Sequence, residues 1–403
     1  MALNQPSSPE PAEPDRPNGR GRKAARWAVP VAVAGIAAAT IGLVPALADP
    51  GAPALPRTTA EHLIADIAGS DVTAVDGTVQ VSVDLGLPSA LSAAPGSLLS
   101  GGADGTGSTG QGSAADPQRQ LTRLLAGSHQ LRVAADGPDR QKLSLVEPAA
   151  EYSVIRDGTR LWAYDSASNQ VFRTTLPARD THAGTALPDA AGTGDLPATP
   201  QEAARQLVRA ARGTASFTVG GTERVAGRSA YDLVVTPEHA AATTVGKAVV
   251  AVDAENGLPL KVTVDAKGGG KPVVQIRFTK VGFARPAAST FTFTPPKGAE
   301  VTEGRTAASR SGSPALRGAA PRTVGSGWDT VAVVDTGAAQ AASGGHKPPS
   351  AALRGFGSRV DGAFGSGTLF HTRLLNALLT DEGTLYVGAV SPSALTAAAN
   401  GTR

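Results

Sequence analysis

The chain has 403 residues, enough for one large domain or two of ordinary size. It carries 37 Lys+Arg and 34 Asp+Glu, and the net charge of +3 is too small to indicate a nucleic-acid-binding surface. The chain has no cysteine, which excludes disulfides, thiolate-bound zinc, iron–sulfur clusters and thiol catalysis.

The N-terminal region predicts export. Residues 1–26, which we expect to be disordered or the n-region of a signal, carry four cations near their end, and residues 27–48 form an uncharged apolar run. The run is long enough to span a bilayer core of ~30 Å, whereas Ala46-Leu47-Ala48 is typical of a signal cleavage site. We therefore expect an extracytoplasmic protein, either anchored in the cytoplasmic membrane or secreted after cleavage near Ala48.

The next elements change from helical to strand periodicity. After a linker at 49–56, Thr58 or Thr59 can cap a helix that runs to about Ala68, with Gly69 as its stop. Residues 72–85 alternate between apolar and polar, which predicts a strand. A Ser/Gly/Ala insertion at 88–115 has no periodicity, and Asp116-Pro117 predicts a short helix that follows it.

Strands and hairpin turns dominate the rest of the segment 55–305. Asp157-Gly158 and Asn256-Gly257 are strong hairpin signals, and for the second we expect a type I′ turn. Thr199-Pro200-Gln201-Glu202 predicts a capped helix between the two groups of strands. About eleven strands are expected, the later ones at 216–219, 223–225, 230–236, 248–253, 260–265, 273–280 and 290–294.

These elements predict an α+β fold in which helices lie on one side of a large, strongly curved antiparallel sheet. A linker at 302–327 separates this domain, at 57–301, from a small C-terminal α/β domain at 328–403 with an internal loop at 335–350. In that second domain we expect strands at 328–334, 368–372 and 385–390 and a last helix that starts at Ser391-Pro392.

No local motif indicates catalysis. The G-x-G-x-x-G at 105–110 lies within the Ser/Gly insertion and not between a strand and a helix, as a phosphate-binding loop requires. The six histidines form no H-E-x-x-H pattern, and there is no G-x-S-x-G elbow. We expect a non-enzymatic protein without metal or cofactor, with a hydrolase built from distant residues as the alternative.

Four short patterns suggest a family. They are the Asp-Gly hairpin at 156–159, W-x-Y-D at 162–165, D-x-x-x-G-L-P-L at 253–260 and F-T-F-x-P-P at 291–296. In combination they resemble the LolA-like family of exported proteins, as found in Gram-positive bacteria with high-GC genomes. The family includes the lipoprotein carrier LolA and the N-terminal domain of the sigma-factor regulator RseB/MucB.

The resemblance implies an unclosed β-barrel, lidded by helices, whose hydrophobic cavity accepts acyl chains of a lipid or lipoprotein. A regulator in the RseB manner would instead bind an anti-sigma factor or another membrane protein. From the alternation alone, the apolar stripes indicate a plain core more than a cavity. Val262 is expected on the inward stripe and Lys261 on the opposite face, where a charge should be tolerated. The candidate lining is Trp162, Tyr164, Phe172, Val262, Phe278, Phe291 and Phe293.

Overall fold

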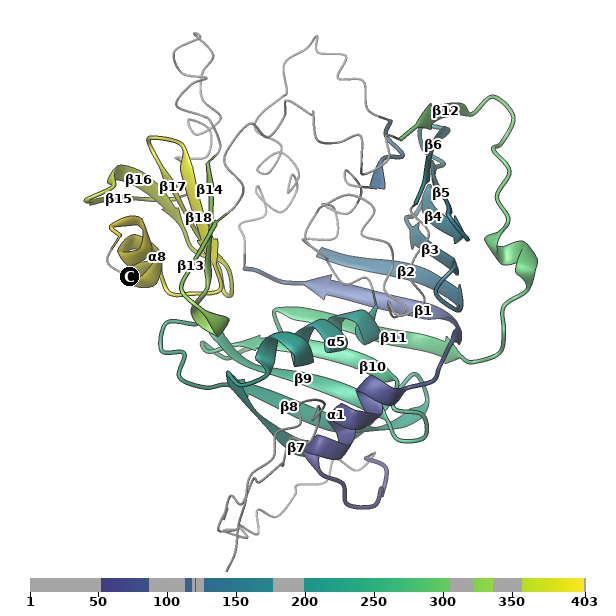
Figure 1. Ribbon diagram of the computed structural model, residues 1–403, viewed down its shortest axis with the longest axis horizontal. Coiled ribbons are helices and arrows are strands. Elements are labelled where there is room, and N and C mark those ends of the chain that lie inside the picture. Colours follow the sequence, from purple (N-terminus) through teal and green to yellow (C-terminus); the bar gives the residue numbers. More distant parts are fainter. Residues whose placement is uncertain are drawn as a thin grey trace, which may run out of the picture. The chain divides into compact units, whose positions relative to one another are not determined.

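A computed structural model describes residues 52–86, 113–117, 120, 127–176, 199–304, 322–335 and 357–401 (Figure 1). The chain divides into two compact units, Met1–Leu47 and Ala48–Arg403, and every described residue belongs to the second. The expected signal segment, the G-x-G-x-x-G motif and most of the Ser/Gly insertion lie outside the described residues. Within them, no helix is both long and apolar enough to cross a membrane.

A 12-stranded sheet forms most of the described structure, in the order β12-β6-β5-β4-β3-β2-β1-β11-β10-β9-β8-β7. The sheet is not closed, because β12 and β7 are its edges. The expected α+β fold with a large open sheet is therefore confirmed. The strands are β1 Ala74–Val83, β2 Gly127–Asp136, β3 Arg140–Val146, β4 Glu151–Asp157, β5 Arg160–Asp165, β6 Gln170–Thr175, β7 Ala215–Val225, β8 Arg228–Pro237, β9 Val245–Asp253, β10 Pro259–Ala266, β11 Val274–Gly282 and β12 Glu300–Glu303.

Strand β1 joins two antiparallel meanders, β2–β6 and β7–β11. It pairs with β2 along its whole length and with β11 on its other side. Short turns connect most neighbouring strands, and their sequences predict those pairings. The pairing of β1 with β11 closes a loop of about 200 residues and has no local signal, so the sequence patterns alone could not predict it.

Helices α1 (Ala60–Gly69) and α5 (Pro200–Ala211) begin where their capping residues predict. The hydroxyl oxygen of Thr59 accepts a hydrogen bond from the His62 amide, and that of Thr199 accepts one from the Glu202 amide, both at 3.3 Å. Such caps satisfy backbone donors that the first turn leaves free. The two helices contact each other and one face of the sheet, α1 over β7 and β8 and α5 over β10 and β11 (Figure 1).

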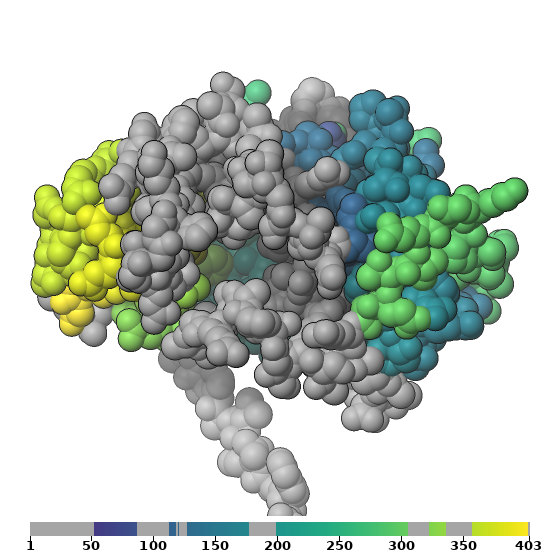
Figure 2. Space-filling view, turned by 90° about the horizontal axis from the view of Figure 1, so that it is seen from above, coloured from purple at the N-terminus to yellow at the C-terminus, as the bar shows by residue number. Residues whose placement is uncertain are grey.

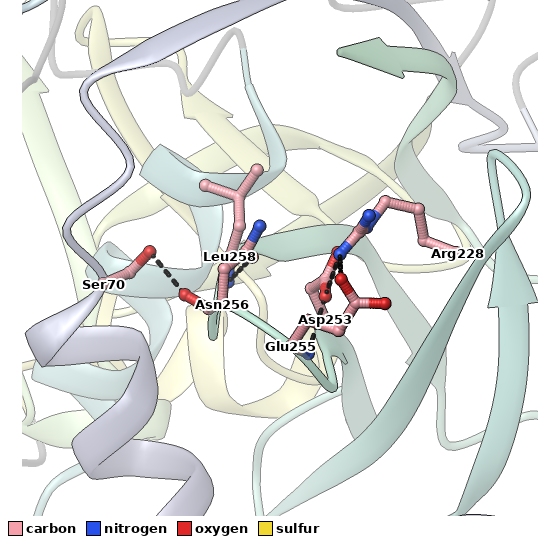
Figure 3. Close-up of polar contacts among 6 residues, drawn as sticks. All are labelled: Ser70, Arg228, Asp253, Glu255, Asn256 and Leu258. Carbon is pink, nitrogen blue, oxygen red and sulfur yellow. Dashed lines mark hydrogen bonds and ion pairs between the residues drawn. The ribbon is translucent and has the colours of Figure 1, made fainter. Parts of the chain in front are cut away.

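The loop between β9 and β10 differs from the expected type I′ turn (Figure 3). The Asp253 amide donates to the Leu258 carbonyl at 2.9 Å, so the loop contains four residues and not two. Only Gly257 has a left-handed φ, 69°, whereas a type I′ turn needs two such residues. The Asn256 side chain accepts a hydrogen bond from the Leu258 amide at 3.0 Å, and the Ser70 hydroxyl, next to α1, donates to the Asn256 carbonyl at 3.0 Å.

Replacement of Gly257 by valine is expected to lower the free energy of unfolding by about 1–3 kcal/mol through backbone strain. A Cβ atom at this position would also lie 2.7 Å from the backbone oxygen of Asp66 in α1. Gly158→Val is the matched control, because Gly158 has a φ of 62° and open space around the same position. Urea denaturation should show a larger loss for Gly257→Val, and an unchanged midpoint would contradict this geometry.

Two expected segments are corrected. Residues 216–219 and 223–225 belong to one strand, β7, with a bulge between Val219 and Thr222 at Gly220-Gly221. Residues 290–294 are not a strand, because the chain forms a 3₁₀ turn, η2 (Ala288–Phe291), and then an unpaired extended stretch. Prolines on both sides of this segment lack the N–H that a sheet ladder needs. Of the helix expected after Asp116, the structure describes Pro117 and Gln120 as helical.

A second, six-stranded sheet lies in the C-terminal part, in the order β13-β14-β18-β17-β16-β15. Helix α8 (Pro392–Ala399) packs on β17 and β18, and its N-cap Ser391 accepts a hydrogen bond from the Ala394 amide, as the Ser-Pro pair predicts. The sequence does not predict the strands at 322–324, 358–362 and 376–380, and the first of them lies in the expected linker. The strands are β13 Arg322–Val324, β14 Val331–Asp335, β15 Ser358–Gly362, β16 Gly365–Phe370, β17 Asn376–Thr380 and β18 Thr384–Gly388, and a 3₁₀ turn, η5 (Gly327–Asp329), precedes β14.

Candidate functional site

The 12-stranded sheet has two unlike faces. We call the face that α1 and α5 pack against the inner face, and the opposite one the outer face. Cross-strand pairs show which side chains share a face, because directly paired residues point to the same side. One such row runs Phe278, Val79, Leu131, Leu145 and Tyr152, from β11 through β1, β2 and β3 to β4, and all five belong to the hydrophobic core.

Three of the candidate lining residues lie on the inner face. Val262 pairs with Ile276 and Phe278 with Val79, and Phe172 pairs with Ala163 in the other meander. All three are buried in the same apolar cluster as the inner surfaces of α1 and α5. Val262 lies on β10, the strand that α5 contacts most, so it is part of a packed interior.

Three other candidates lie on the outer face. Trp162 and Tyr164 alternate along β5 with the buried Leu161 and Ala163, which point inward. The Phe293 ring lies 5.6 Å from the Trp162 ring and 5.7 Å from the Tyr164 ring, measured between centroids. The segment after β11, green in Figure 2, runs past the strands of the β2–β6 meander.

Phe291 is also in this segment and is 1% exposed, where η2 contacts β3 and β4. Its neighbour Thr290 lies beside outer-face side chains of β1–β3. The structure therefore does not bring the seven candidates together. The candidates are the large aromatic side chains of the predicted strands together with Val262, and size alone ignores the alternation that sends neighbours to opposite faces.

A small apolar hollow opens on the inner face, where the two meanders meet. Its volume is about 60 Å³, and it is lined from the sheet by Val75, Val133, Leu143, Leu258 and Phe278, and from the start of α5 by Thr199, Gln201 and Glu202. This is room for only a few water molecules, whereas ligand pockets usually measure roughly 300–1,000 Å³. At this place the described residues of the inner face are thus close-packed.

The inner face is covered unevenly by the described helices. The main contacts of α1 and α5 with the sheet fall on β7, β8, β10 and β11. The apolar inner row nevertheless continues through β2–β6, where Val133 and Val154 are only half-buried. Segment 113–117 reaches this region: Ala115 is fully buried in the core, and its carbonyl accepts a hydrogen bond from the Tyr152 hydroxyl at 3.2 Å.

A carboxyl pair on the outer face of β7 and β8 has unusual electrostatics. Burial, together with the hydrogen bond and the negative charge of Glu223, raises the pKa of Asp232 to about 7. Lys261 forms an ion pair with Glu223, and the charges of Lys261 and Lys247 oppose the rise. Lys261 is therefore on the outer face, as expected, but it is engaged in a charge cluster, and the expectation that Lys261→Asp is silent is not supported by these contacts.

Replacement of Asp232 by asparagine is expected to change the pH dependence of stability. Asp232 has a higher pKa in the folded state than its ordinary 3.8, so between about pH 4 and pH 7 the folded state holds a proton that the unfolded state has lost. The free energy of unfolding should therefore fall as pH rises through this window. Asp232→Asn should remove that fall and be more stable than wild type at pH 8, but not at pH 4. Parallel wild-type and variant curves from chemical denaturation would contradict this assignment.

No metal site is evident in the described ranges, in which no three His, Asp or Glu side chains are grouped as ligands. Within the same ranges the candidate site is an apolar surface and not a catalytic constellation. Such a surface can bind a hydrophobic group.

Comparison with known proteins gives only weak similarities. No family model matches the chain, and no curated protein matches it. Among solved structures, the MucA/MucB complex of Pseudomonas aeruginosa is 17% identical and covers 84% of this chain and 96% of that chain, with a TM-score of 0.39. A LolA superfamily protein from Nitrosomonas europaea is 12% identical and covers 59% and 99%, with a TM-score of 0.21.

An uncharacterised conserved protein from Thermus thermophilus is 11% identical and covers 60% of this chain and 98% of that chain, with a TM-score of 0.31. None of these values establishes membership in a family. They also give no support for a Gram-positive origin.

Proposed function

We propose that this is an extracytoplasmic, non-enzymatic protein that binds an acyl chain of a lipid or lipoprotein on the inner face of β2–β6. The observation that carries the proposal is the uneven cover of the inner face. The described helices pack mainly on the β7–β11 meander, while the apolar row continues through β2–β6. An acyl chain laid along that row would gain about 0.8 kcal/mol for each buried CH₂ group.

The hollow of about 60 Å³ marks the place where this surface would open. Val133 and Leu143 form its wall on the sheet, and Thr199 and Glu202 at the start of α5 form the opposite side. A chain of many methylenes requires a larger space, so the start of α5 would have to move away from β2 and β3. Polar residues at this end of α5 would face water when it does, at little cost.

The sequence supports the same proposal. The patterns at 156–159, 162–165, 253–260 and 291–296 resemble those of LolA-like exported proteins, and the cationic and apolar segments at 1–48 are typical of an export signal or membrane anchor. An acyl chain presented at the outer surface of the cytoplasmic membrane is the ligand that such a location provides.

Replacement of Val154 by aspartate is expected to weaken binding of a fluorescent fatty-acid probe by at least about tenfold, or about 1.4 kcal/mol. Val154 is half-buried on the inner face of β4, between Leu143 and Ala163. A carboxylate there would face the acyl chain, yet it would keep enough contact with water for the domain to fold. Probe fluorescence measures the affinity, and circular dichroism checks the fold.

Val219→Asp is the matched control for Val154→Asp, because Val219 is 36% exposed on the edge strand β7, far along the sheet from β4. This variant should bind the probe as wild type does. If wild type fails to bind the probe, or if both variants lose binding equally, the acyl-binding proposal is contradicted.

Binding of a membrane protein, such as an anti-sigma factor, is the second candidate function. The observation in its favour is the edge strand β15, most of whose residues are exposed and which pairs with β16 on one side. An edge of this kind can accept a strand from another protein. A stoichiometric membrane protein recovered with the chain, together with no probe binding, would favour this candidate over the first.

A further inference from the structure

A second, larger hollow lies on the outer face of the sheet. It has a volume of about 590 Å³ and is formed by β1, β2, β3, β11 and the start of β4, together with Thr290. This volume falls within the range of small-molecule sites. Its lining is mainly polar, and the residues that matter below are Thr78, Arg132, Lys142, Ser144, Lys280 and Thr290.

The register of the strands brings the cations of this hollow together. Thr78 in β1 pairs with Lys280 in β11 on one side and with Arg132 in β2 on the other, and Arg132 pairs with Ser144 in β3. Paired side chains have Cβ atoms roughly 4.5–5.5 Å apart. Lys142 is two residues before Ser144 on the same strand, so it points to the same face. Three cations and the hydroxyls of Thr78 and Ser144 therefore line one small area.

The carboxylates in the lining leave these cations only partly neutralised. Over the described ranges, no carboxylate oxygen forms an ion pair with Arg132, Lys142 or Lys280. Asp76 is exposed at the rim. Glu151 accepts a hydrogen bond from the Ser153 hydroxyl at 2.8 Å, and Ser153 is also 2.9 Å from Ser144.

The surroundings of Glu151 favour its ionised form. Burial opposes its ionisation, but the hydrogen bonds of Ser153 and Ser144 and the charges of Lys142 and Arg132 outweigh burial and lower the pKa of Glu151. It is thus a fixed carboxylate that moderates two of the three cations. Three cations against two carboxylates leave a net positive hollow.

We propose that this outer hollow binds a phosphate group. Clustered Arg and Lys side chains with hydroxyl donors are the usual partners of phosphate oxygens, since charge-assisted hydrogen bonds are stronger than neutral ones. The proposal is separate from the acyl-binding proposal, because it rests on polar side chains of the outer face, although Val133, Ala134 and Lys142 line both hollows. The phosphate group can belong to the headgroup of a lipid or can be free inorganic phosphate. The experiment below distinguishes these two sources by titrating a compound of each kind.

The test is isothermal titration calorimetry of the full chain at low ionic strength, with inorganic phosphate in one arm and glycerophosphoethanolamine in the other. Saturable binding in either arm supports the proposal. Tighter binding of glycerophosphoethanolamine identifies a headgroup site, in which Asp76 and Glu151 meet the ammonium group, and binding of inorganic phosphate alone identifies a free-phosphate site.

Lys280→Gln should weaken the observed binding at least tenfold, and Thr78→Val should weaken it to a smaller extent. Both side chains lie on the sheet surface, and Lys280 is exposed, so the fold should not change. Lys271→Gln is the matched control. Lys271 is exposed and lies shortly before the first residue of β11, at the end opposite to Lys280, and the variant has the same net charge as Lys280→Gln. No saturable heat in either arm would overturn the proposal, as would equal affinities for Lys280→Gln and Lys271→Gln.

Discussion

Replacement of Arg228 by alanine is expected to lower the free energy of unfolding by about 3–5 kcal/mol, because it leaves a buried carboxylate without its cation. The Asp253 side chain is only 1% exposed. Arg228 Nε and Nη2 donate to its two oxygens, the second at 2.9 Å, and Nη2 also donates to Glu255 at 2.9 Å (Figure 3). The guanidinium also lies 4.9 Å from the centre of the Phe283 ring.

The matched control for this variant is Glu255→Gln. Glu255 contacts the same guanidinium, but its side chain is 80% exposed, and an exposed ion pair contributes at most about 1 kcal/mol. Guanidinium chloride denaturation of both variants measures the difference. Equal and small losses would show that solvent reaches Asp253, and would contradict the buried pair that holds the β9–β10 loop against β8.

Replacement of Val262 by aspartate is expected to unfold the large domain, with a loss of more than about 4 kcal/mol. Val262 is 4% exposed, on the strand most in contact with α5, and it packs with Ile276 and Val250. A carboxylate at this position would have neither water nor a cation to stabilise it. Thermal denaturation followed by circular dichroism should show no cooperative transition.

The same substitution distinguishes a dry, packed interior around Val262 from a cavity that water can enter. A cooperative transition near the wild-type midpoint would mean that water reaches Val262, and would contradict the packing of α5 on β10. Val219→Asp again serves as the control, because its 36% exposed side chain can place a carboxylate in solvent without loss of stability.

The local elements could be predicted because their causes are local. Thr59 and Thr199 cap the helices that their side chains predict, and the alternation of apolar residues marks most strands. The same alternation places Val262 inside and Lys261 outside. The 3₁₀ turn at Ala288–Phe291 was missed because a run of Thr and Phe has a strong preference for strands, and the neighbouring prolines override that preference.

The candidate site could be predicted only in part. Trp162 and Tyr164 were grouped with Phe172, although the parity of β5 and β6 sends them to opposite faces. The register that follows from the Asp157-Gly158 turn and the next loop was the signal that could have separated them. The outer hollow depends on the pairing of β1 with β11, about 200 residues apart. Gly77, an isolated glycine in a strand pattern, lies next to the register shift between Thr78 and Val79, where a Cβ atom would collide with the backbone oxygen of Lys280.

The most direct test of acyl binding is mass spectrometry of lipid extracted from the native protein after purification without detergent. We expect an acyl-bearing lipid or lipopeptide to be retained in a fixed ratio to wild-type protein and to Val219→Asp, and to be lost from folded Val154→Asp. A folded wild-type protein that retains no acyl-bearing molecule, and takes up none when mixed with fatty acid, would contradict the account.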